Sequence, residues 1–155
     1  MAVMNADHIN PFLIASTKVL KDFGVDVTVG KPSVKQASFS KDSLIIMIGV
    51  TGEMRGQVII SFSKGAACGI ASKMMMMPVA ELNDISTSAI CELGNMILGN
   101  AATIFANKGI GIDITPPTMC SGDVTFSNNF TANISIPLLM SDGLQIDINV
   151  SVKGE

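Results

Sequence analysis

Apolar residues recur at helical spacing in three stretches of the chain. The first stretch predicts a helix over 11–23, with Asn10 as its N-cap, because a proline suits the first helical position. The second predicts a helix that begins after Ser63 and ends before Pro78. The third predicts the longest helix, over 85–107, capped by Asn83 or Asp84. Its predicted buried side contains Ile85, Ala89, Met96 and Ile104.

Alternating or continuously apolar runs predict strands around these helices. The segments 25–29 and 110–114 alternate between β-branched and polar or small residues, and each follows a glycine. The apolar runs 43–50 and 57–62 flank a turn at 52–56, which predicts a hairpin. The remaining segment, 123–152, predicts two further strands joined at 141–143.

The two halves of the chain resemble each other in the order of their predicted elements and in the positions of glycine and proline between them. A shift of 85 positions places Glu92 on Asp7, Asn95 on Asn10, Gly109 on Gly24 and Pro117 on Pro32. We therefore expect one domain over 1–155, with an internal repeat of approximately 7–62 and 92–152. The predicted fold is α+β, a pseudo-twofold repeat with a mostly antiparallel sheet and about three helices packed on one face.

Composition and charge argue against some classes of function. The chain has 155 residues, 48% of them hydrophobic, and a net charge of -3 without clustered Lys or Arg, which argues against nucleic acid. Its longest strongly apolar stretch, 43–50, is far shorter than the ~20 residues that span a bilayer, and the start lacks the pattern of a signal peptide. We expect a cytoplasmic protein that contacts no membrane and hides apolar surface in an oligomer.

The segment 88–100 carries the candidate chemistry. Glu92 and Asn95 are three residues apart on the predicted helix, so they share one face. A carboxamide both donates and accepts hydrogen bonds and can orient a water molecule, while the carboxylate can pair with an incoming cation. The chain has one histidine, His8, and no hydrolase or phosphate-loop motif. An acid and an amide can be sufficient for catalysis where a partner protein supplies the electrophile and the metal, as a phosphorylated receiver domain would.

Two alternatives stay open for this face. An acid and an amide on a helix are most often solvated surface. However, Gly94 and Gly99 lie inside the same predicted helix, where each glycine costs ~1 kcal/mol relative to alanine. They require either tight packing within the fold or the close approach of a partner.

Three motifs together resemble the CheX branch of the CheC, CheX and FliY phosphatases. They are the segment 88–100, the segment 113–118 followed by Ser121-Gly122, and the early Asn10-Pro11-Phe12 with 30–33. The resemblance implies dephosphorylation of the chemotaxis response regulator CheY. It further implies that Glu92 forms a salt bridge to the regulator's active-site lysine and that Asn95 positions the attacking water. Magnesium would belong to the partner, with no metal or cofactor held by this chain, and Ser88, Gly99 and Asn100 are expected partner contacts.

The resemblance also implies a homodimer with one site per subunit. CheC-like members carry two sites, whereas CheX-like members use the second one. Here the first-half counterpart is Asp7 with Asn10, and Pro11 is predicted to leave Asp7 outside the helix, which separates the pair. The alternative function is a non-catalytic module that binds a phosphorylated receiver domain or the flagellar and chemotaxis assembly.

Overall fold

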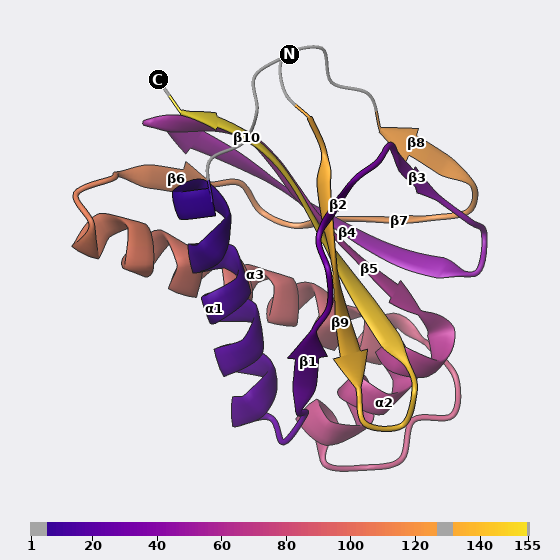
Figure 1. The fold of residues 1–155 in the computed structure, drawn as a ribbon. Helices are drawn as coiled ribbons and strands as arrows, with labels where there is room; N and C mark the ends of the chain where they lie inside the picture. The colour runs from indigo at the N-terminus through magenta and orange to yellow at the C-terminus, as the bar shows by residue number, and fades with distance from the viewer. Residues whose placement is uncertain (1–5, 127–131, 155) are drawn as a thin grey trace.

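The structure, a computed structural model, describes residues 6–126 and 132–154. In chain order, its elements are α1 (Ala6–Asp22), β1 (Val27–Val29), β2 (Ser33–Val34), β3 (Ala37–Phe39), β4 (Ser43–Gly52), β5 (Met54–Ser63), α2 (Lys64–Met75), α3 (Asp84–Asn107), β6 (Ile112–Ile114), β7 (Thr118–Ser121), β8 (Val124–Phe126), β9 (Ile134–Met140) and β10 (Gln145–Gly154) (Figure 1).

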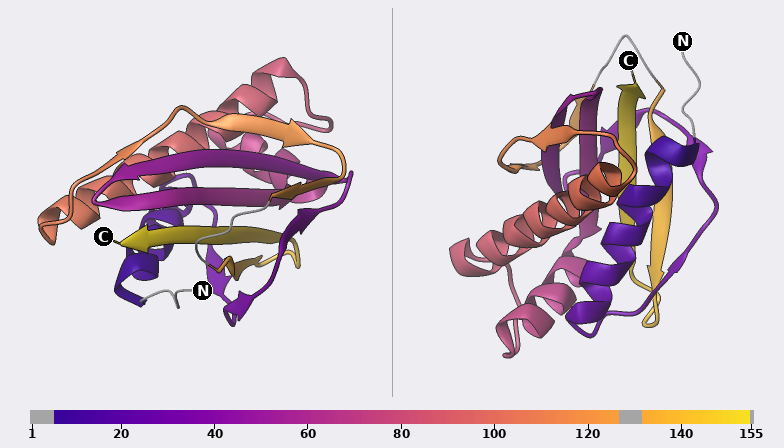
Figure 2. Two further views of the ribbon diagram at one scale, coloured as in Figure 1. Left: turned by 90° about the horizontal axis from the view of Figure 1, so that it is seen from above. Right: turned by 90° about the vertical axis from the view of Figure 1, so that its left-hand side faces the viewer.

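The main sheet is antiparallel, in the order β1-β9-β10-β5-β4-β6. In addition, β2 pairs with β9 and β7 with β4, while β3 and β8 form a separate two-stranded sheet. Figure 2 shows α1 and α3 side by side on one side of the main sheet, with α2 near the start of α3. The predicted α+β class and the mostly antiparallel sheet are confirmed.

The strand pairing is symmetric about the centre of the sheet. The antiparallel pair β5 and β10, with Ile60 opposite Ile148, lies between two equivalent halves. On one side of this central pair, β1 and β2 pair with β9. On the other side, β6 and β7 pair with β4. Each half of the chain thus has one helix followed by five strands, α1 with β1–β5 and α3 with β6–β10, and α2 lies between the two copies in the sequence. The bounds of the repeat and the assignment of 1–155 to one domain stay predictions.

Alternating side chains divide the sheet between two apolar clusters. On β4, Leu44, Ile46 and Ile48 face the main core, whereas Ile45 belongs to a smaller cluster with Ile59 beneath β3 and β8. The β3 and β8 pair lies at the upper right of Figure 1, apart from the three helices. The main core therefore lies between the helices and one face of the sheet, where it fixes α3 in place.

Helix α3 is long and apolar enough, judged only by length and composition, to cross a membrane. Eight of its residues are buried within the fold, however, and Phe105 packs edge-on against Phe12 of α1 with ring centroids 5.2 Å apart. Its opposite side carries exposed polar groups such as Glu92. These features are those of a core helix in a folded domain.

The predicted start of the first helix is wrong. Helix α1 begins at Ala6, and Pro11 lies buried inside it. A proline there has no N–H for the carbonyl one turn earlier, but this removes only one helical bond near the start of the helix. Burial of the proline ring with Phe12 and Ala15 offsets that loss. Asp7 therefore lies inside the helix, and Asp7 and Asn10 share a helical face after all.

Several short elements were not predicted. The sequence indicated two strands over 123–152, and β9 and β10 confirm them with their turn at 141–143, but β8 lies in the same range. Strands β2, β3 and β7 were also missed. All four have two to four residues and are mainly exposed or half-buried, so they carry little hydrophobic periodicity. The chain has four consecutive methionines at 74–77. Met74 and Met75 pack against the core, whereas Met76 and Met77 are exposed.

Candidate functional site

The start of α3 is fixed by a capping box. The side chain of Asn83 accepts a hydrogen bond from the backbone N–H of Ser86 at 2.9 Å, and the Ser86 hydroxyl accepts one from the Asn83 N–H at 2.7 Å. Asn83, one of the two predicted caps, is therefore the N-cap. This defined start sets the rotation of every later side chain on the helix.

The buried side of α3 differs from the predicted one. Ile85 is 68% exposed, and Ala89, Met96 and Ile104 are only half-buried. The helix is apolar on several sides, so spacing alone did not identify its centre. The residues that lie against the fold are Ser86, Ile90, Leu93, Gly94, Ile97, Leu98, Ala101 and Phe105.

Glu92 and Asn95 lie on the opposite side of α3. Glu92 is exposed and Asn95 half-buried, and the step of three positions between them corresponds to about 4.5 Å along the helix axis. Neither side chain has a hydrogen bond or an ion pair with another described residue. A carboxylate and a carboxamide are thus held together on a rigid helix with their hydrogen-bonding capacity unused within this part of the chain.

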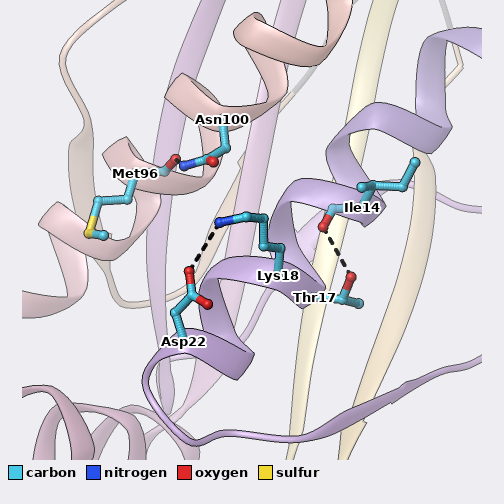
Figure 3. A network of polar contacts seen from close by, with 6 residues as sticks. All are labelled: Ile14, Thr17, Lys18, Asp22, Met96 and Asn100. Atoms are coloured by element: carbon cyan, nitrogen blue, oxygen red, sulfur yellow. Dashed lines mark hydrogen bonds and ion pairs between the residues drawn. The ribbon is translucent and has the colours of Figure 1, made fainter.

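Two of the expected partner contacts have hydroxyl or amide groups bonded within the helix. The Ser88 hydroxyl donates to the carbonyl of Asp84 at 2.7 Å, and Ser88 is exposed on the Glu92 side. The Asn100 amide donates to the carbonyl of Met96 at 2.8 Å, as Figure 3 shows. Asn100 is rotated by about 140° from Asn95 around the axis, so the structure does not bring it onto the same face as Asn95.

The two glycines of α3 have different surroundings. A Cβ atom on Gly94 would lie 3.0 Å from Cγ2 of Ile46 on β4, so this glycine allows the helix to approach the sheet. A Cβ atom on Gly99 would meet nothing within 4 Å. Tight packing within the fold therefore explains Gly94 but does not explain Gly99.

Glu92 and Asn95 lie outside the open hollow that is found elsewhere on the fold. An open hollow of about 250 Å³ is lined by Asp26, Lys73 and Asp142, among others, and by no residue of α3. Within 6–126 and 132–154, no group of three or more His, Cys, Asp or Glu side chains could hold a metal ion. The pair lies on the outer face of α3, outside this hollow.

Cys91 is the titratable thiol next to this pair, and burial raises its pKa above the ordinary value. The side chain is therefore a neutral thiol at neutral pH, in which form it is a poor nucleophile. We predict that Cys91→Ala leaves the activity of this site close to that of the wild type. A large loss of rate in a variant with unchanged thermal stability would instead indicate a thiol-dependent step.

Solved structures give the class of protein that this fold defines. A CheC-like superfamily protein from Shewanella sp. PV-4 matches 97% of this chain and all of its own chain, at 28% identity and a TM-score of 0.87. The CheX–CheY–BeF3–Mg²⁺ complex from Borrelia burgdorferi matches 96% of this chain and 99% of that chain, at 29% identity and a TM-score of 0.82. The fold is that of the CheC-like superfamily.

Sequence comparison gives the family within that class. Residues 44–136 match the family model of the chemotaxis phosphatase CheX. The CheY-P phosphatase CheX of Thermotoga maritima is 34% identical over 152 residues, which cover 97% of this chain and 98% of that protein. The chain belongs to the CheX family of chemotaxis phosphatases. The predicted family is confirmed, whereas the roles of individual site residues stay predictions.

Proposed function

We propose that this protein is a phosphatase that removes the phosphoryl group from the aspartate of a phosphorylated CheY-like receiver domain. The observation that carries the proposal is the pair of exposed Glu92 and half-buried Asn95 on the outer face of α3, unbonded to other described residues, in a chain of the CheX family. The relative from Thermotoga maritima bears the name CheY-P phosphatase, and the Borrelia burgdorferi complex contains CheY. Both support a receiver as substrate.

Asn95 is the proposed catalytic residue. Its carboxamide would enter the receiver's active site and hold a water molecule in line with the phosphorus–oxygen bond that breaks. An amide is not a useful base at neutral pH, so its contribution is position and orientation. The anchoring of α3 between its capping box and the core reduces the motion of that carboxamide.

Glu92 is the proposed docking residue. Its exposed carboxylate would pair with the active-site lysine of the receiver, which places Asn95 one helical turn away at the phosphoryl group. Charge stabilisation of the transition state would come from that lysine and from the receiver's magnesium ion. The active site would thus be assembled from two proteins. A homodimer with one site per subunit and a cytoplasmic location stay predictions.

A phosphate-release assay tests the function. Receiver domains of the same organism are phosphorylated, and inorganic phosphate is measured with this protein at one-tenth of the receiver concentration. Catalytic turnover predicts that phosphate is released faster than by the receiver alone and that each molecule of this protein accelerates the loss of more than one phosphate. A non-catalytic binding module would leave the phosphate lifetime of every receiver unchanged or lengthen it.

Replacing Glu92 by glutamine removes the charge and retains the shape of the side chain. We predict that kcat/KM for the phosphorylated receiver falls about tenfold, which corresponds to about 1.4 kcal/mol. The difference from the wild type should shrink as salt is added, because ions screen a charge pair at the rim of an interface. The matched control is Glu81→Gln, which neutralises an exposed carboxylate outside α3. Equal kcat/KM values for wild type and Glu92→Gln at low salt would contradict the docking role.

A further inference from the structure

Gly99 lacks an explanation within the fold. It lies in the interior of the 24-residue helix α3, where glycine destabilises a helix by about 1 kcal/mol relative to alanine. It does not cap the helix, which continues to Asn107, and a Cβ atom there would point into open space. Gly94, five residues earlier, is explained by the close contact with Ile46. Gly69 on α2 has equally open surroundings, so the reason for Gly99 must lie in its position on α3.

The position of Gly99 relative to the acid and amide pair suggests that reason. Gly99 follows Glu92 by seven residues and Asn95 by four, so it lies within about 40° of both around the helix axis. It is about 6 Å beyond Asn95 along the helix. A partner that covers Glu92 and Asn95 therefore also covers Gly99.

We propose that Gly99 is a positioning residue that allows the phosphorylated receiver to approach the backbone of α3. This inference rests on the proposed function. Any side chain at position 99 would extend from the helix by at least one carbon–carbon bond, about 1.5 Å. It would hold the receiver away from α3 and withdraw the Asn95 carboxamide from the phosphoryl group. A misplacement of about 1 Å can lower a rate about 100-fold.

Helix α1 provides a natural comparison. The 85-residue shift that aligns Asn95 with Asn10 aligns Gly99 with Ile14. Ile14 is 51% exposed and extends away from α3 in Figure 3. Asp7 and Asn10 share a helical face on α1, yet that face carries a large apolar side chain where α3 has Gly99. Bulk at Ile14, in place of a break at Pro11, gives a physical reason for one functional face per subunit.

A size series at position 99 tests the inference. In Gly99→Ala and Gly99→Leu, the maximal rate of receiver dephosphorylation should fall about 10-fold and about 100-fold. Thermal unfolding should occur at the same or a higher temperature, because both residues favour helix more than glycine does. Lower activity together with undiminished stability is the result that a purely structural glycine would not give.

The matched control is Gly69 on α2. A Cβ atom at Gly69 also meets nothing within 4 Å, and the residue lies on a different helix. Gly69→Ala and Gly69→Leu should leave the dephosphorylation rate unchanged. If wild-type protein accelerates phosphate loss and Gly99→Leu does so equally well, the positioning role is wrong while the proposed function stands. If the wild-type protein has no effect on any phosphorylated receiver, both are wrong.

Discussion

Replacing Asn95 by alanine is expected to slow dephosphorylation of the receiver about 100-fold. The side chain lies on the exposed face of a helix whose other face is buried, and it makes no hydrogen bond to another described residue. Its removal therefore leaves the fold intact and removes only the group that would orient water. The single-turnover rate at saturating protein should fall to nearly the receiver's own rate of phosphate loss.

Binding should be largely retained in that variant, because the docking charge of Glu92 remains. This is measured with a receiver loaded with beryllofluoride, which imitates the phosphoryl group without being hydrolysed. The matched control is Asn107→Ala, which removes an exposed amide at the end of the same helix and should leave the rate unchanged. A rate that falls only because binding is lost would assign Asn95 to docking instead of water orientation.

Replacing Phe105 by alanine is expected to destabilise the protein by about 3–5 kcal/mol. The ring is fully buried and packs edge-on against Phe12 at a centroid distance of 5.2 Å and an interplanar angle of 62°. The substitution leaves a cavity where α3 meets α1. For a chain of this size, we expect the midpoint of thermal unfolding to fall by roughly 10 °C.

The control for this loss of aromatic packing is Phe39→Ala. Phe39 also forms an edge-on pair, with Phe126 at 6.3 Å, but it is half-buried and belongs to the smaller cluster. Its removal should lower the midpoint by much less. Similar shifts for the two variants would contradict the view that the contact between α1 and α3 anchors the site helix.

The candidate site can be predicted from the sequence because α3 is long and has a clear N-cap. The i, i+3 spacing of Glu92 and Asn95 fixes their common face in any α-helix, whatever the rest of the fold. The side of the helix that meets the sheet is harder to predict: apolar spacing places Ile85 on the buried side, whereas the structure exposes it. An apolar residue near a helix start can remain exposed when the chain enters the helix at the edge of the core.

The error at α1 has a related cause. The preference of proline for the first helical position predicts a start at Pro11, but this preference is local and the tertiary fold overrides it. The different roles of Gly94 and Gly99 were also inaccessible, because each depends on which strand lies beneath the helix. Only the neighbouring position of Ile46 shows that one glycine is explained by packing and the other is not.

The most direct test of the central claim is the lifetime of the aspartyl phosphate in one receiver domain, measured with no added protein, with saturating wild type and with saturating Asn95→Ala. If α3 supplies half of a shared active site, the wild type shortens the lifetime and the variant restores nearly the value of the receiver alone. An equally shortened lifetime with both proteins would contradict the assignment of Asn95. A lifetime that the wild type leaves unchanged or lengthens would contradict the phosphatase itself.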